Sequence, residues 1–308
     1  MAHMEKLTSQ NKKVLLSLTA LAIIIAGVWF SGDYYHVSCG LESGRARMAP
    51  AYADVKFNPL LFYPAVKENP APPPSHSSGR ALIAPHHDLA SRLVARAMAG
   101  ISSSEIKTII IIGPNHANAG LGEVITAPIT WRTDLGAVEP DQELIYALKQ
   151  ENLAVFDRER LSGEHSITAL IPLVKYYFPK ARVAPIILNH DVQKEISDKL
   201  AVFINHHLDG AALVIGSLDF SHYLPSFQAE KNDEITKKAI LEFDYEKIFS
   251  FNDDFVDSPI TLATILKAAA LAKLGRPEFV GHGNSAEMIN ADNVLSSTSY
   301  FTILFNQD

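Results

Sequence analysis

Residues 107–118, KTIIIIGPNHAN, decide the fold that the sequence predicts. The four consecutive isoleucines at 109–112 indicate a strand that is buried on both faces, which is typical of the middle of a parallel sheet. A glycine and a proline end this strand, and His116 lies just beyond its carboxyl end. Ligands of open α/β sheets bind at that edge, so the sequence places an imidazole where chemistry is commonly done.

Composition and short motifs exclude several classes of function. The 308 residues are 47% hydrophobic, which is enough for one large core or two small ones. The net charge of -7 and the absence of a Lys/Arg-rich block predict no nucleic-acid partner. The single cysteine, Cys39, excludes an intramolecular disulfide framework and a cysteine-cluster metal site. No GxxxxGK[ST], GxGxxG or GxSxG motif is present, which argues against a phosphate loop, a dinucleotide fold and a serine-hydrolase elbow.

The amino-terminal part predicts a membrane anchor. Residues 14–32 are almost wholly apolar and just long enough to span a bilayer, at about 1.5 Å per residue. Lysines precede this stretch and no Lys or Arg follows it until Arg45. We therefore expect residues 1–13, which begin with a tag-like MAHM, to be cytoplasmic and the main domain to lie outside, in a single-pass arrangement. A cleaved signal peptide is the alternative.

Residues 33–79 are expected to be a Pro/Ser-rich linker, and residues 80–308 an α/β domain. Apolar runs predict strands, and helical spacing of apolar residues predicts helices of 10 to 16 residues between them. The expected strands are 81–84, 109–112, 122–127, 181–188, 211–217, 279–281 and 299–305. The expected helices are 89–100, 140–151, 167–178, 191–206, 228–243 and 260–274. The alternation predicts a largely parallel or mixed central sheet with helices on both faces.

Four polar clusters follow strands or open a helix in this reading. Because the carboxyl ends of parallel strands share one edge, the clusters are expected to meet there although they are far apart in the sequence. They are PHHD at 85–88, PNH at 114–116, EHS at 164–166 and DFSH at 219–222.

Roles can be assigned within these clusters. His86 and His116 are the expected metal ligands, because neutral imidazole is the commonest ligand for zinc, copper and non-haem iron. Asp219 and His222 are three residues apart, so the carboxylate is expected to fix the tautomer of a general base. His165 is expected to position substrate or a metal-bound water. A hydrogen-bonded structural histidine is the alternative for each residue taken singly.

The chain resembles the Memo-like family, also called AmmeMemoRadiSam system protein B. The similarity covers about residues 80–305, and it is carried by short motifs in the family's order: APH at 84–86, GPNH at 113–116, EHSI at 164–167, SLDFSH at 217–222 and SPI at 258–260. The resemblance implies a fold similar to class III extradiol ring-cleaving dioxygenases. Those enzymes hold iron(II) with two histidines and a carboxylate and use another histidine as base, whereas Memo-like proteins bind copper or iron through two histidines and a cysteine.

This sequence departs from the family's pattern at the cysteine, whose position falls on Phe255. Asp257, or with less support Asp254, is the hypothetical third metal ligand. A carboxylate there would favour iron(II), with copper or zinc as the other options. A capping role for both aspartates, or a degenerate metal site, is the alternative.

The expected function is that of a membrane-anchored Memo-like metalloprotein, with redox or dioxygenase-type chemistry on an unknown small-molecule or peptide substrate. One alternative is a non-catalytic binding module for a peptide or for a partner protein of the AmmeMemoRadiSam system. A second alternative is a metal-assisted hydrolase in which Asp219 and His222 activate water. The sequence leaves open whether the protein is an enzyme at all.

Overall fold

The computed structural model describes residues 51–72, 79–101, 106–208, 210–291 and 294–307. The predicted cytoplasmic tail, the predicted membrane span at 14–32 and Cys39 lie outside these residues. Within the described ranges, no helix has the length and apolar character needed to cross a bilayer.

The isoleucine run lies in the middle of the main sheet, as predicted. It belongs to β3 (Thr108–Pro114), which pairs in parallel with β8 (Arg182–Leu188) on one side and with β9 (Ala212–Ser217) on the other. On its far side β9 pairs in parallel with β2 (Gly79–Ala84). These four strands therefore end at one common edge of the sheet, with β9 between β2 and β3.

Further strands make the sheet mixed, with the order β10-β12-β2-β9-β3-β8-β4-β7 and with β11 also paired to β12. Antiparallel pairing joins β12 to β2, β10 and β11, and joins β4 to β8, whereas β7 is parallel to β4. The bounds are β4 (Val124–Thr126), β7 (Val155–Phe156), β10 (Phe220–Leu224), β11 (Glu278–Asn284) and β12 (Ser297–Asn306). The sequence missed β7 and β10, because both are short and lack a run of apolar residues.

Alternate residues of β3 build two separate cores. Ile109 and Ile111 pack into one core, and Ile110 and Ile112 into the other. All four are fully buried, and burial of each is worth about 1.5–3 kcal/mol. This explains why β3 reads as an unbroken apolar run and not as an alternating one.

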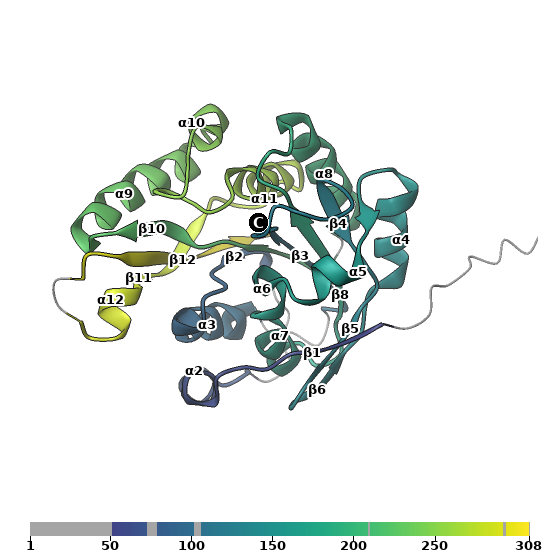
Figure 1. The fold of residues 1–308 in the computed structure, drawn as a ribbon, viewed down its shortest axis with the longest axis horizontal. Coiled ribbons are helices and arrows are strands. Elements are labelled where there is room, and N and C mark those ends of the chain that lie inside the picture. Colours follow the sequence, from purple (N-terminus) through teal and green to yellow (C-terminus); the bar gives the residue numbers. More distant parts are fainter. Residues whose placement is uncertain (1–50, 73–78, 102–105, 209, 292–293, 308) are drawn as a thin grey trace, which may run out of the picture. The chain divides into compact units, whose positions relative to one another are not determined.

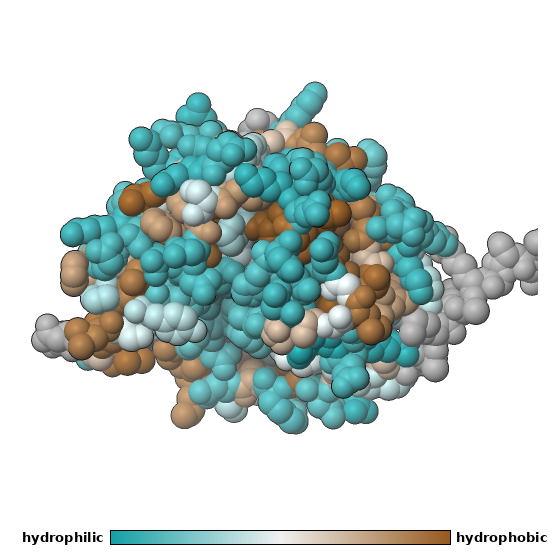
Figure 2. All heavy atoms as spheres, turned by 45° about the horizontal axis from the view of Figure 1, so that its top comes forward, coloured by the Kyte–Doolittle hydropathy of each residue, from teal (hydrophilic) through white to brown (hydrophobic). Residues whose placement is uncertain are grey.

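Helices cover both faces of the sheet (Figure 1). On the face of Ile109 lie α2 (Pro59–Glu68), α3 (Ser91–Ile101), α5 (Arg158–Ser162), α6 (His165–Thr168) and α7 (Ile171–Tyr177). On the face of Ile110 lie α4 (Gln142–Gln150), α8 (Lys194–His207), α9 (Ser226–Glu242), α10 (Tyr245–Phe249) and α11 (Pro259–Leu271). The 3₁₀ turn Asp88–Ala90 and α12 (Ser285–Met288) complete the helical elements of the described chain. Figure 2, with the top of Figure 1 turned forward, shows mostly hydrophilic side chains and apolar ones between them, as expected of amphipathic helices.

The folded part of the chain extends into the stretch expected to be a linker. β1 (Tyr52–Asp54) pairs in parallel with β5 (Thr130–Thr133), and β5 pairs with β6 (Gly136–Val138) in a small second sheet. Helix α2 follows, and its Phe62 is 4% exposed in the core under β3. The proline-rich composition that suggested a linker begins only after α2, so β1 and α2 are folded elements that precede the boundary expected at Arg80.

Candidate metal centre

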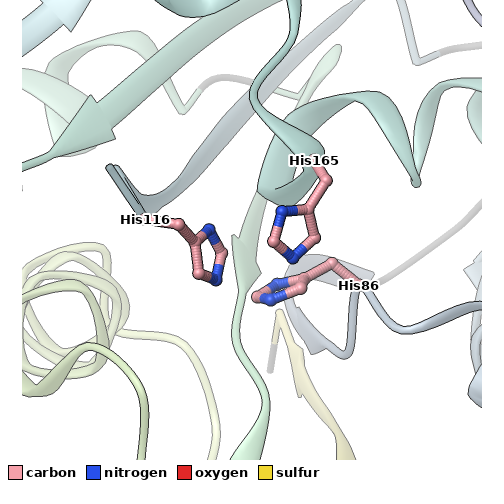
Figure 3. Close-up of side chains that lie close together, drawn as sticks. All are labelled: His86, His116 and His165. Atoms are coloured by element: carbon pink, nitrogen blue, oxygen red, sulfur yellow. The ribbon is translucent and has the colours of Figure 1, made fainter. Parts of the chain in front are cut away.

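Three histidines meet at the carboxyl edge of the parallel strands (Figure 3). His86 directly follows the turn after β2, His116 lies just beyond β3, and His165 is the first residue of α6. Each offers one ring nitrogen, and these nitrogens lie within 4.8 Å of one another. The ring centroids of His86 and His116 are 5.0 Å apart, which confirms the predicted convergence of these two residues.

Hydrogen bonds determine which nitrogen of His86 is free. Its Nδ1 is 3.1 Å from the Ser217 hydroxyl, and that hydroxyl donates its own proton to the backbone carbonyl of Ser166. The hydroxyl must therefore accept from Nδ1–H, which leaves the Nε2 lone pair available. Burial, followed by the neighbouring imidazoles of His116 and His165, holds the pKa of His86 well below its ordinary value. A neutral imidazole with a free Nε2 is the form that binds a metal.

Glu164 orients His116 in the same way. Its carboxylate accepts from the His116 backbone N–H at 3.1 Å and lies 2.7 Å from His116 Nδ1. It also caps α6 by accepting from the Ser166 backbone N–H. Burial raises the pKa of Glu164, but the hydrogen bonds from His116 and Ser166 outweigh it and lower the pKa, so the carboxylate is ionised. An ionised acceptor on Nδ1–H leaves Nε2 of His116 free, which is the carboxylate–histidine arrangement common behind metal ligands.

His165 joins the cluster, whereas the sequence suggested a place beside the substrate. Its ring stacks on His116 with 3.9 Å between centroids, and its side chain is 57% exposed. Burial and the charge of His116 lower the pKa of His165. The cluster therefore has a buried floor, His86, and an open side formed by His116 and His165.

Two buried aspartates lie beside Nε2 of His86. Asp219 accepts from the His86 backbone N–H at 3.0 Å, and its other oxygen lies 3.7 Å from Nε2 of His86. Asp257 lies 3.3 Å from the same Nε2, accepts from the Asp219 backbone N–H, and has a buried second oxygen without a hydrogen-bond partner. Burial raises the pKa of Asp219, and burial together with the charge of Asp219 raises that of Asp257 further. Asp257, the hypothetical third ligand, contacts His86 but lies outside the three-imidazole group.

No hydrogen bond joins His222 to Asp219 among the described residues, although the charge of each acts on the pKa of the other. Asp219 turns to His86 instead, and Nδ1 of His222 is buried without a hydrogen-bond partner among the described residues. The backbone N–H of His222 donates to the Asp253 carbonyl at 2.8 Å. Burial lowers the pKa of His222, although the carboxylates of Asp219 and Asp253 act in the opposite direction. The lowered pKa favours the neutral imidazole.

The comparison with known families now bears on this site. A family model described as Memo-like protein matches residues 61–304. The chain belongs to the Memo-like protein family. A MEMO1 family protein of Caldivirga maquilingensis is 32% identical over 212 residues, which are 65% of this chain and 72% of that protein. One of Sulfurisphaera tokodaii is 25% identical over 205 residues, 64% of this chain and 72% of that protein.

Among solved structures, the uncharacterized protein JW3007 from Escherichia coli K12 has a TM-score of 0.46 and 12% sequence identity to this Memo-like chain. The likeness covers 72% of this chain and 99% of that one.

The residues of this Memo-like site fit a metal ion. Three nitrogens lie close enough to reach one ion, and the tautomers of His86 and His116 leave Nε2 available on both. The orphaned oxygen of Asp257 lies on the residue that flanks His86. Three protein ligands with an open side are the arrangement of catalytic metal sites, in which further positions are left for water or substrate. Sequence reasoning missed Ser217 as the partner of His86, since no pattern links residues 131 positions apart.

Gly113 allows α6 to reach the strand edge. A Cβ atom at this position would lie 2.9 Å from both Cβ and Oγ of Ser166 and 3.2 Å from Cβ of Ser217. Gly113→Ala is therefore expected to push α6, with His165, away from β3 and to destabilise the protein by about 1–3 kcal/mol. Denaturant unfolding measures this. Gly100→Ala is the control: nothing lies within 4 Å of its added Cβ, so it should stabilise α3 by about 0.5–1 kcal/mol. Equal effects of the two substitutions would contradict this role for Gly113.

The neutral state of His86 predicts a pH dependence of stability. The unfolded chain takes up a proton near the ordinary pKa of 6.5, whereas folded His86 does so only at much lower pH. The stability contributed by neutral His86 is therefore fully present above pH 6.5, the pKa in the unfolded chain. It is lost as the pH falls below 6.5, by about 1.4 kcal/mol of unfolding free energy per pH unit. Between pH 6.5 and 5.5, wild type should lose stability more steeply than His86→Gln.

Urea unfolding at several pH values measures the two slopes of this pH dependence. Asp219 and Asp257, whose pKa values are raised, stabilise the folded state as the pH falls, and both proteins carry them. The difference between the two slopes therefore measures the effect of His86 protonation on the free energy of unfolding. Parallel pH curves for the two proteins would show that His86 protonates in the folded state as readily as in the unfolded one.

Proposed function

We propose that this Memo-like protein binds a divalent metal ion through His86, His116 and His165, and that iron(II) is the favoured ion, with copper or zinc as the others that imidazole accepts. The observation that carries the proposal is the approach of three imidazole nitrogens within 4.8 Å, two of them on rings whose Nδ1 is already engaged. The position of the family's cysteine holds Phe255, so this position supplies no thiolate that would favour copper(I).

The proposed activity is redox or oxygen chemistry of the dioxygenase type on a small substrate. A bound iron(II) would supply the binding and activation of oxygen. The open side at His116 and His165 leaves room for substrate, and the buried Asp219 and Asp257 lie beside Nε2 of His86. His222, whose pKa is lowered by burial, is the proposed base for a substrate hydroxyl.

Oxygen consumption by the iron(II)-loaded protein tests the proposed activity. A panel of catechols is expected to give uptake that His222→Gln lowers by about 10²–10⁴-fold, the range in which a general base contributes. Iron content measured on the same samples should be unchanged by His222→Gln, since this residue lies outside the three-imidazole group. Hydrolysis of a parallel panel of esters and amides, without oxygen uptake, would replace the proposal by metal-assisted hydrolysis.

We also propose that residues 14–32 hold this domain at a membrane, with proteins of the AmmeMemoRadiSam system as partners. The apolar stretch and the lysines before it support the anchor. Washing membranes at alkaline pH should leave the full chain in the pellet and release a chain that begins at Met48. Release of both chains would contradict the anchor.

A further inference from the structure

A buried carboxylate outside the histidine cluster, that of Asp233, binds the residue that precedes His222 in β10. Asp233 of α9 is 1% exposed and accepts hydrogen bonds from three strands. Its Oδ1 accepts from the hydroxyls of Ser221 on β10, at 2.7 Å, and of Ser299 on β12, at 2.6 Å. Its Oδ2 lies 2.7 Å from Nε2 of His282 on β11.

The three hydrogen-bond donors around position 233 require a carboxylate. Two hydroxyls and one imidazole N–H present three donors, and only an acid whose oxygens both accept can satisfy all of them. An asparagine would turn its NH₂ group toward a donor. Three hydrogen bonds also offset the cost of burying the charge of Asp233.

The strand segment that carries His222 is irregular and lacks a regular ladder. Phe220 pairs with Ser299 and Leu224 with Ser297, so four steps along β10 correspond to two along β12. Inside this bulge Tyr223 has a φ of 58°, in the left-handed region, and its ring is 74% exposed and 5.4 Å from that of His222. Bulges beside active sites re-aim a side chain, and strained residues persist there only when their surroundings hold them.

Few anchors hold the bulge. The backbone N–H groups of Ser221 and His222 donate to carbonyls of Phe255 and Asp253, in the loop before α11. From the other side the hydroxyl of Ser221 donates to Asp233, with the Ala229 carbonyl as a more distant acceptor at 3.4 Å. Ser221 precedes His222 directly, so a shift of one moves the other.

We propose that Asp233 is a positioning residue for His222, and that it acts through the Ser221 hydroxyl by fixing the bulge in β10. The inference rests on the proposed function for the role of His222 as a base, but not for its geometry. The hydrogen bonds of the Asp233 carboxylate join it to Ser221, Ser299 and His282, none of which belongs to the three-imidazole group.

Two serines offer a matched test. Ser221 and Ser299 are both fully buried and donate to the same oxygen at nearly equal distances. Ser221→Ala and Ser299→Ala each remove one hydroxyl and leave Asp233 with two donors. If Asp233 only ties α9 to the sheet, the two variants should behave alike. If it positions His222, only Ser221→Ala should change His222.

The readout is NMR of the full chain with ¹⁵N-labelled histidine, in which His222→Gln identifies the His222 signals. Ser221→Ala is expected to move the ring signals of His222 and to speed exchange of its backbone amide by about tenfold or more, as for loss of a hydrogen bond to a charged group. Ser299→Ala should leave both unchanged. Asp233→Asn should move the same ring signals. It is an independent test of the positioning role if Ser221→Ala does not fold.

Equal changes at His222 in both serine variants, or none in Ser221→Ala and Asp233→Asn, would overturn the positioning role. None of these measurements requires metal or turnover. A wild-type protein that consumes no oxygen would therefore refute the proposed function while leaving the positioning role to be decided by the NMR signals alone.

Discussion

Replacing His86 or His116 by alanine is expected to lower the affinity for iron(II) by more than about 100-fold. Loss of a residue that merely orients a ligand lowers metal affinity by about 10–100-fold, and loss of the ligand itself should exceed this. His86 is the stronger case, because its ring is buried and its Nδ1 is held by the Ser217 hydroxyl, so that Nε2 is oriented before a metal arrives. Isothermal titration and metal analysis after dialysis measure the loss.

His206→Ala is the control for these substitutions, since His206 is exposed in the last turn of α8 and lies outside the three-imidazole group. It should bind metal like wild type. The third ligand is settled by two further variants. His165→Ala is expected to weaken binding as His116→Ala does, whereas Asp257→Asn should weaken it less, because Asp257 lies outside the imidazole group. Metal content unchanged by both His86→Ala and His116→Ala would remove the metal centre.

A chain that begins at Arg80 is expected to lose most of its stability. The truncation removes β1 and α2, and with them Val55, Phe62 and Val66, which are 4–5% exposed in the core under β3. Burial of each such side chain contributes about 1.5–3 kcal/mol. Their sum approaches the whole unfolding free energy of an ordinary domain, about 5–15 kcal/mol. Truncation also strips β5 of its parallel partner.

A chain that begins at Met48 is the matched comparison for this truncation, because it keeps every described residue. It should unfold cooperatively in urea, whereas the chain that begins at Arg80 should aggregate or unfold with little added denaturant. Equal urea midpoints for the two chains would show that α2 and β1 add nothing to the domain, and would restore the boundary expected from the proline-rich stretch.

Local sequence was sufficient to predict the central strand of the sheet. Four β-branched residues in a row at 109–112 can be buried only where both faces of a strand are covered, and β3 lies there. The edge strands were harder, because short elements such as β7 and β10 owe their conformation to partners that the chain supplies from elsewhere. The same holds for β1, which has no apolar run of its own and is extended because β5 pairs with it.

By itself the sequence determined that His86 and His116 meet, since both follow parallel strands and such strands end at one edge. Only the tertiary structure decided their neighbours. Asp219 accepts a hydrogen bond from His86, 133 residues away, whereas its three-residue spacing from His222 brings no hydrogen bond among the described residues. His165 enters the cluster because α6 packs over Gly113. The physical reason is that strand direction is a property of the backbone and follows from local pattern. Side-chain pairing at the edge depends on distances of a few ångströms, which are set by how helices and loops pack over the sheet.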